Sequence, residues 1–136
     1  MIERIPPQSL DSEEALLGSI LVNYRVLDDV SDVITKHDFY KESHELLFDA
    51  MIELYKKNEP IDIITLKNYL EAGQKLERIG GASYLSRLTD KTIGASNLRN
   101  YARIIKEKSF LRRVITKCNN LSEDAYVQSD YASFSE

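Results

Sequence analysis

The chain has 136 residues, of which 43% are apolar and 29% charged, with a formal net charge of −4 at pH 7. These values are ordinary for a soluble globular protein and allow one domain with one modest core. They exclude a membrane span, because no run of about 18 apolar residues occurs, and the early acid and missing apolar segment exclude a signal peptide.

The first 22 residues are predicted to form an extended arm followed by a helix. Proline at positions 6 and 7 cannot lie inside a helix, so residues 1–8 are expected to be extended. Ser9 or Asp11 can cap a helix that runs to Val22, because leucine and isoleucine recur along one face of it.

Four shorter helices are predicted next, because apolar residues recur three or four apart between glycine and proline breaks. They span residues 24–34, 43–57, 62–73 and 82–90. Asp62 is the expected N-cap of the third of these helices, and Gly73 is expected to end it in the left-handed conformation. Gly80 and Gly81 are expected to supply two unusual backbone angles at a turn, and residues 92–95 to turn into the last helix.

A long basic helix at residues 96–121 is the most informative feature of the chain. Apolar residues recur three or four apart from Leu98 to Leu121, and no glycine or proline interrupts them, so this helix would span roughly 35–40 Å. A small domain has no need of so long a helix for its own core. We therefore expect its apolar stripe to meet another molecule.

Charge is divided unevenly between this helix and the rest of the chain. Residues 96–121 carry seven basic residues against one acid, a charge of +6, so the remaining residues carry −10. This division indicates a protein partner or a nucleic acid, with a solvated helix face as the alternative. The net charge of −4 and the absence of interleaved exposed aromatic residues count against direct DNA binding. The candidate phosphate contacts for such binding are Arg99, Arg103, Arg112 and Arg113.

The predicted fold class is all-α, because no window shows sustained alternation of apolar and polar residues and only residues 61–65 are β-like. Residues 122–129 are predicted to form a loop, and residues 130–136 the first turns of another helix. The lone Cys118 excludes an internal disulfide, which fits a reducing cytoplasm. Its place in the apolar stripe predicts a packed thiol, with a reactive thiol beside basic residues as the alternative.

Candidate catalytic groups are few and do not converge. His37 and His44 lack the spacing and the cysteine neighbours of a metal site, and His44 at a helix start is expected to be structural or capping. The adjacent acids at positions 13–14 and 28–29 diverge on a helix, whereas acid–base catalysis needs convergence. No phosphate-binding loop, dinucleotide fingerprint or nucleophile elbow occurs. We therefore predict no catalytic, cofactor-binding or metal-ligating residue.

Five sequence blocks occur in order between residues 4 and 121, and together they are difficult to obtain by chance. They are Arg4-Ile5-Pro6-Pro7-Gln8-Ser9-Leu10 with Glu13, Glu14, Leu17 and Gly18; Asp38-Phe39-Tyr40 with His44 and Leu47-Phe48-x-Ala50-Met51; Glu59-Pro60-Ile61-Asp62-x-x-Thr65-Leu66; Leu76-Glu77-x-x-Gly80-Gly81-x-x-Tyr84-Leu85; and Asn97 with Tyr101-Ala102-x-Ile104-Ile105, Lys108 and Leu111-Arg112-Arg113. In these blocks the chain resembles the start of bacterial DnaB-type replicative DNA helicases.

The resemblance implies an N-terminal domain: an arm (1–8), a compact head of about five short helices (9–95), and a long helix that begins a helical hairpin (96–136). In this family, hairpins of neighbouring subunits pack together and arrange six copies as a trimer of dimers. The resulting collar covers the motor domains, which use ATP and Mg to unwind DNA at the replication fork. The collar also docks the helicase-binding C-terminal domain of primase, and a helicase loader or initiator is a further candidate partner.

The resemblance also places interaction residues by motif position. Primase docking in relatives falls here on Tyr84, Ile115 and Leu121, and the hairpin interface also includes Leu111 and Cys118. Core packing is the alternative for each.

The chain departs from the family pattern at two places. Relatives commonly read Val-Pro-[Ser/Thr]-Ala-Ala-Asn before the long helix, whereas residues 92–97 read Thr-Ile-Gly-Ala-Ser-Asn, which predicts a looser turn. The second hairpin helix stops at Glu136, so the chain resembles a domain cut from a longer protein and is expected to be monomeric or to form a non-native dimer. The related C-terminal domain of primase is disfavoured, because the Ile-Pro-Pro-Gln-Ser start lies next to Met1.

Overall fold

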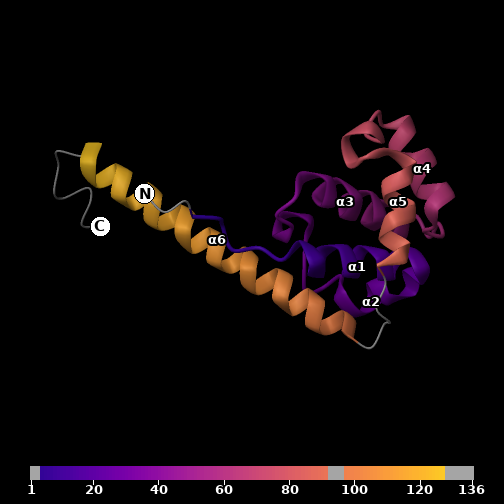
Figure 1. The fold of residues 1–136 in the computed structure, drawn as a ribbon, viewed down its shortest axis with the longest axis horizontal. Helices are drawn as coiled ribbons and strands as arrows, with labels where there is room; N and C mark the ends of the chain where they lie inside the picture. The colour runs from indigo at the N-terminus through magenta and orange to yellow at the C-terminus, as the bar shows by residue number, and fades with distance from the viewer. Residues whose placement is uncertain (1–3, 92–96, 128–136) are drawn as a thin grey trace.

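The computed structural model describes residues 4–91 and 97–127, and every regular element in those ranges is a helix (Figure 1). The predicted all-α class is confirmed. A head lies at one end of the molecule, and α6 extends away from it (Figure 1). The α-helices are α1 (Leu10–Val22), α2 (Leu27–Val30), α3 (Glu42–Lys56), α4 (Ile63–Ala72), α5 (Gly81–Asp90) and α6 (Leu98–Val127), with the short 3-10 helices η1 (Tyr24–Val26), η2 (Lys36–Asp38) and η3 (Glu77–Ile79).

Helix α1 is the centre of the head. It contacts α3, α5 and α6, and its side chains Leu16, Leu17 and Ile20 are fully buried. Burying each such side chain contributes roughly 1.5–3 kcal/mol, so α1 holds the other helices together. The predicted cap is confirmed, because the Ser9 hydroxyl accepts a hydrogen bond from the Ser12 N–H at 3.3 Å.

The helices α3, α4 and α5 pack around α1 through apolar side chains at helical spacing. Their predicted spans are confirmed to within one residue at each end. No helix in the described ranges is both long and apolar enough to cross a bilayer. The most buried apolar side chains of these helices include Phe48 and Met51 on α3, Leu66 and Leu70 on α4, and Leu85 and Leu88 on α5.

The single helix predicted at residues 24–34 is wrong. The chain instead forms η1, the four-residue helix α2 and a turn. Asn23 is extended, and its side chain accepts a hydrogen bond from the Arg25 N–H at 3.3 Å, which favours a tight turn over a regular helix. Leu27 and Val30 still reach the core, as the apolar spacing predicted.

Helix α4 is capped as predicted at its start but ends differently. The Asp62 side chain accepts from the Thr65 N–H, which confirms the N-cap. Gly73 has an ordinary φ of −86°, so its predicted left-handed conformation is wrong. The left-handed residue is Gln74, with a φ of 59°, one position later. Gly73 is the C-cap of α4, so the left-handed position falls on the residue that follows it.

The glycine pair before α5 has the two unusual backbone angles that were predicted. Gly80 has a φ of 104° and Gly81 a φ of 75°. A Cβ on Gly80 would lie 3.0 Å from the Cβ of Tyr84, which is tighter than most Cβ contacts in proteins. Gly80 therefore permits both the turn and the close approach of Tyr84.

Helix α6 is longer than predicted. It runs to Val127, so the loop predicted at residues 122–129 is wrong as far as residue 127, because no glycine or proline interrupts the helix there. The turn predicted at 92–95 and the helix start predicted at 130–136 lie outside the described residues. Residues 4–9 form no helix, as predicted for the arm, and pass beside α6 (Figure 1).

We expect Gly80→Ala to lower the free energy of unfolding by about 1–3 kcal/mol, because alanine is strained at a left-handed φ and its Cβ meets Tyr84. Urea unfolding followed by circular dichroism measures this change. Gly73→Ala is the matched control and should be neutral or slightly stabilising, since its φ is ordinary and its new Cβ would lie 3.6 Å from the nearest atom. Equal losses in both variants would contradict this interpretation.

Candidate protein-interaction surface

One face of α6 packs against the head. Leu98, Ala102, Ile105 and Ser109 are buried on it, at the spacing of one helix face. This face contacts α1, α2 and η2. The N-terminal half of α6 is therefore part of the head's core.

A second set of apolar residues lies on the outer side of α6, roughly half a turn from the buried face at about 100° per residue. These residues do not extend the core of the head, because the head does not cover them. We call this set the outer stripe. Its members Phe110, Leu111, Val114, Ile115 and Leu121 are 41–58% exposed, and Cys118 is exposed among them.

Helix α6 continues well past the head. Every described residue after Arg112 is exposed, which is about 22 Å of helix from residue 113 to residue 127 (Figure 1). A helix without tertiary packing is marginally stable in water. Exposed apolar side chains along such a helix indicate that another polypeptide covers it.

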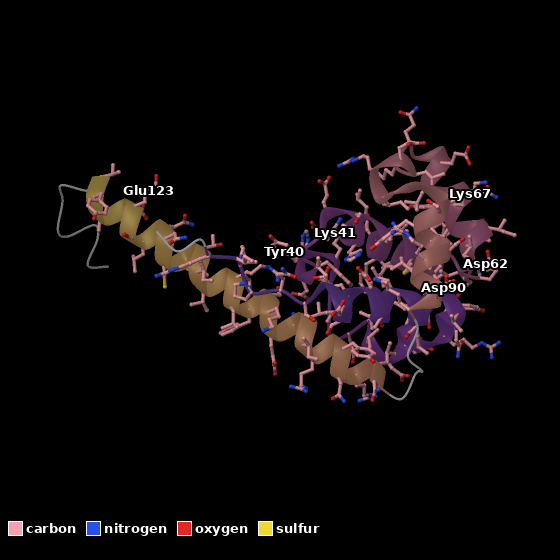
Figure 2. The ribbon with its side chains drawn as sticks, in the orientation of Figure 1. Tyr40, Lys41, Asp62, Lys67, Asp90 and Glu123 are labelled. Atoms are coloured by element: carbon pink, nitrogen blue, oxygen red, sulfur yellow. The ribbon has the colours of Figure 1, made fainter. Side chains whose placement is uncertain are left out.

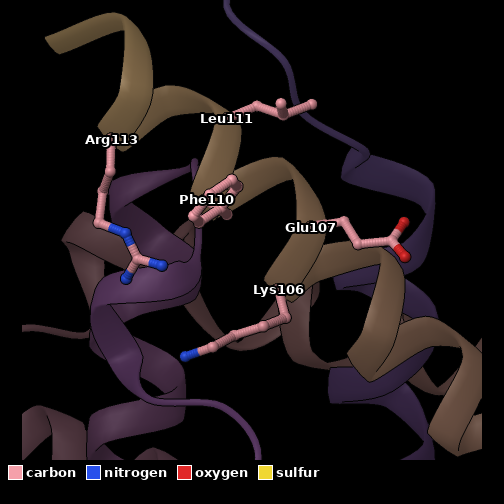
Figure 3. Close-up of a pocket in the computed structure, with 5 residues that line it drawn as sticks. All are labelled: Lys106, Glu107, Phe110, Leu111 and Arg113. Atoms are coloured by element: carbon pink, nitrogen blue, oxygen red, sulfur yellow. The ribbon is translucent and has the colours of Figure 1, made fainter. Parts of the chain in front are cut away.

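A shallow hollow of about 480 Å³ lies at the head end of the outer stripe. It is lined by Lys106, Glu107, Phe110, Leu111 and Arg113. In Figure 3, the Phe110 ring lies between the side chains of Lys106 and Arg113, and the Leu111 side chain points away from both. The Arg113 guanidinium lies 5.9 Å from the Phe110 ring centroid. The hollow thus offers an apolar surface with charged side chains around it.

Cys118 lies where the sequence did not predict, whereas Tyr84 takes the core position that was its stated alternative. The packed thiol predicted for Cys118 is wrong, because the head ends before α6 reaches this residue and the thiol is exposed. Tyr84 is 7% exposed on α5, so it belongs to the core and not to the outer stripe. The structure therefore brings Leu111, Ile115 and Leu121 onto one surface and leaves Tyr84 apart from them.

Tyr84 ends a buried chain of hydrogen bonds through His44 to Glu13. The Nδ1 atom of His44 lies 2.7 Å from Oε1 of Glu13, and its Nε2 atom lies 2.6 Å from the Tyr84 hydroxyl. A carboxylate only accepts, so Nδ1 donates to Glu13, and in a neutral imidazole Nε2 accepts from Tyr84. Burial, followed by the nearby charge of Glu14, raises the pKa of Tyr84 to about 12.

Glu13 is a buried structural residue whose place in the core the sequence reasoning missed. It is 1% exposed and accepts hydrogen bonds from the backbone N–H groups of Tyr40 at 2.8 Å and Lys41 at 3.5 Å. It therefore ties α1 to the segment before α3. The sequence does contain a pattern that predicts its burial. Glu13 precedes Leu17 by four residues and Ile20 by seven, which places it on the buried face of α1.

Asp38 joins η2 to α6. Its carboxylate is 2% exposed and accepts hydrogen bonds from the Thr35 N–H and the Ser109 hydroxyl, both at 2.8 Å, and from Lys106 Nζ at 3.3 Å. Burial alone would raise the pKa of Asp38, but these hydrogen bonds and the charge of Lys106 outweigh burial and hold the pKa below its usual value.

Arg112 bridges three segments. Its Nη1 donates to the Pro7 carbonyl at 2.8 Å and its Nη2 to the Asp38 carbonyl at 2.7 Å, while its guanidinium lies 5.5 Å from the centre of the Tyr40 ring. Figure 2 shows Tyr40 and Lys41 at the side of the head that faces α6. This arginine is therefore used within the chain, between the arm, η2 and α6.

The other candidate phosphate contacts have different surroundings. Arg113 lies 3.9 Å from the Asp38 carboxylate, and Arg103 pairs with Glu107 at 3.0 Å one turn away. Arg99 is exposed at the start of α6. Within the described residues, no group of three or more His, Cys, Asp or Glu side chains could hold a metal ion.

Comparisons with known proteins agree with the fold and with the sequence blocks. The family model of the DnaB-like helicase N terminal domain matches residues 5–107. The replicative DNA helicases DnaB of Geobacillus stearothermophilus and DnaC of Bacillus subtilis are 41% and 37% identical over 94% of this chain. The chain spans 28% of the length of each.

Solved structures show the same architecture. The crystal structure of the N-terminal domain of DnaB helicase from Mycobacterium tuberculosis matches with a TM-score of 0.92 at 34% identity, over 96% of this chain and 93% of that one. The N-terminal domain of DnaB helicase from Helicobacter pylori, studied with its interactions with primase, matches with a TM-score of 0.71 at 22% identity, over 85% and 90% of the two chains. At that identity the second match shows the fold alone.

We expect Asp38→Asn to lower the free energy of unfolding at pH 7 by about 2 kcal/mol, because it removes charge-assisted hydrogen bonds to a buried group. The folded-state pKa of Asp38 is depressed, so its contribution is present above the usual value of 3.8 and is lost as the pH falls through the lower folded value. Urea unfolding between pH 7 and pH 3 should show the difference from the wild type shrinking below about pH 4.

The matched control for this experiment is Asp49→Asn. Asp49 pairs with Lys36 of η2 at 3.5 Å but is partly exposed, so its loss should cost less than about 1 kcal/mol. A difference for Asp38→Asn that stays constant across the pH series would contradict the role given to its carboxylate.

Proposed function

The chain belongs to the family of DnaB-like helicase N-terminal domains, and from this membership we propose that it is the interaction domain of a replicative DNA helicase. In this proposal the chain forms part of the collar over a separate motor domain, which binds ATP and Mg and unwinds DNA in the cytoplasm. The observation that carries the proposal is the outer stripe on the part of α6 that leaves the head. The chain's own residues then contribute assembly and docking rather than catalysis.

The proposed first occupant of the outer stripe is a second copy of this chain. Leu111, Val114, Cys118 and Leu121 follow one another at intervals of three, four and three residues, which is the spacing of a coiled-coil seam. A second copy presents the same seam, so a two-fold interface is self-complementary. Burial of this apolar area, at about 25 cal/mol per Å², would favour association against its ordering costs. Such pairs are the proposed units of the hexamer, as a trimer of dimers.

Primase is the second proposed partner, through its helicase-binding C-terminal domain. The support is that a relative of the same fold was solved with its interactions with primase. We place this docking on the outer stripe and its hollow, where Phe110 and Leu111 are accessible. Tyr84 would contribute indirectly, because it is buried: its hydroxyl bonds to His44, and Lys41 and Arg87 lie 5.0 and 5.1 Å from its ring centroid.

A specific observation also supports nucleic-acid binding as a second candidate function. Five basic residues lie within an arc of about 80° along α6, at about 100° per residue. Phe110 is exposed on the same arc, so the expectation that no exposed aromatic is interleaved with the basic residues is wrong. A basic surface with an aromatic residue suits a single strand. The five residues are Arg99, Arg103, Lys106, Arg113 and Lys117.

We expect the double substitution Ile115→Ser and Leu121→Ser to weaken self-association at least about tenfold, because each removes apolar burial of more than about 1 kcal/mol. Sedimentation equilibrium of the 136-residue chain measures this effect. Ile64→Ser is the matched control, since Ile64 is equally apolar and 70% exposed but lies on α4. A wild-type chain that stays monomeric at millimolar concentration would contradict the proposed self-association.

Calorimetry tests whether primase binds to the same surface. We expect Phe110→Ala and Leu121→Ala to weaken binding of the C-terminal domain of primase while the circular dichroism of the chain stays unchanged. Ile64→Ser again serves as the control. Unchanged affinity in both variants would remove primase from the outer stripe but would leave the family assignment intact.

For the nucleic-acid candidate, we expect fluorescence anisotropy to show salt-dependent binding of a single-stranded oligonucleotide. Replacing Arg99 and Lys117 with alanine should reduce the slope of log K against log salt by about 1.4, which is about 0.7 per phosphate contact on a single strand. Lys67→Ala and Lys75→Ala on the head are controls of equal charge. Absence of binding at low salt would dismiss this function.

A further inference from the structure

The last part of α6 that touches the head is held by polar groups. Leu98, Ala102 and Ile105 pack as apolar side chains, but the next head-facing residues are Ser109 and Arg112. Apolar packing therefore fixes the start of α6, while hydrogen bonds fix the point where the helix leaves the head. Apolar contacts are non-directional, whereas hydrogen bonds weaken steeply away from their preferred angles.

The groups that hold this point are themselves fixed from the side of the head. The Asp38 carboxylate is oriented by the Thr35 N–H at 2.8 Å, in the capping box at the start of η2. Its other oxygen accepts from Ser109 at 2.8 Å. A buried carboxylate oriented from both sides has little freedom to turn, because moving it would leave a buried charge without partners.

Arg112 adds a second connection of different geometry. It donates to the Asp38 carbonyl and to the Pro7 carbonyl, so it ties α6 to the backbone of η2 and of the arm. Guanidinium hydrogen bonds lie in one plane with fixed angles. The two connections lie about one turn apart on α6, at Ser109 and at Arg112, and together they resist both tilting and rotation of the helix.

We propose that Asp38, Ser109 and Arg112 form a latch that fixes the direction in which α6 leaves the head. The latch is a positioning device: it touches no partner, and it determines where the outer stripe lies relative to the head. Its consequence for assembly rests on the proposed function, because only a stripe held at one angle presents the same surface in every copy. The direction of α6 itself is a property of this chain alone.

The length of α6 beyond its last apolar contact with the head makes small changes in its direction measurable. Thirteen residues from Ile105 to Cys118 span about 20 Å of helix, so a tilt of about 20° would move Cys118 by roughly 7 Å. Cys118 is the sole cysteine of the chain and is exposed, so it accepts a spin label without other substitutions. Lys67, exposed on α4 at the far side of the head, supplies the second site as Lys67→Cys (Figure 2).

Double electron–electron resonance between these two labels tests the latch in the 136-residue chain. The labelled chain is diluted with an excess of unlabelled chain, so that only distances within one molecule are recorded. We expect one narrow distance distribution with the wild-type latch. In Asp38→Asn and in Arg112→Met we expect a distribution shifted or broadened by roughly 5 Å or more, as the helix length of about 20 Å requires.

The controls distinguish a change in the direction of α6 from a loss of folding. Asp49→Asn removes an ion pair to η2 that does not involve α6, and it should leave the distance distribution unchanged. Circular dichroism confirms folding of each variant, and Ser109→Ala supplies a milder change should Asp38→Asn fail to fold. A distribution that stays unchanged in both Arg112→Met and Ser109→Ala would overturn the latch. The distance is recorded at a concentration at which the labelled chain sediments as a monomer, so the latch and the proposed function fail independently.

Discussion

The buried carboxylate of Asp38 connects the two parts of this molecule, because it accepts hydrogen bonds from η2 on one side and from α6 on the other. Without that connection, α6 would be joined to the head by the apolar contacts at its start and by the hydrogen bonds of Arg112 to the carbonyls of Pro7 and Asp38. Glu13 has the same role inside the head, where it links α1 to the backbone before α3 and, through His44, to Tyr84 on α5. Two acidic side chains thus fix the relative positions of elements that apolar packing merely brings together.

Helix α6 has two apolar faces, one packed against the head and one exposed. The face with Ala102 and Ile105 completes the core of the head, and the outer stripe lies on the opposite side. The outer stripe continues beyond the last contact with the head, where nothing in the described part of the chain covers it. A second polypeptide is the physical complement of such a surface, and this is the basis of the proposed role in assembly.

Local patterns of the sequence were sufficient for most of the fold, because the period of apolar residues and the capping residues act within a few positions. The position of Asp38 was not predictable in this way, since its partner Ser109 lies 71 residues along the chain. Cys118 was misplaced for a related reason: the same period describes a helix face in a core and a helix face at an interface. For Tyr84 the resemblance left partner contact and core packing open, and the packing of α5 shows that its side chain is buried.

The central claim is that the part of α6 beyond the head is completed by another molecule. Amide hydrogen exchange of residues 113–127, followed across a series of chain concentrations, tests it most directly. The account predicts rapid exchange in the dilute chain and strong protection once the chain associates, because an unpacked helix is marginal in water. Strong protection of these amides in a chain that sediments as a monomer would contradict it.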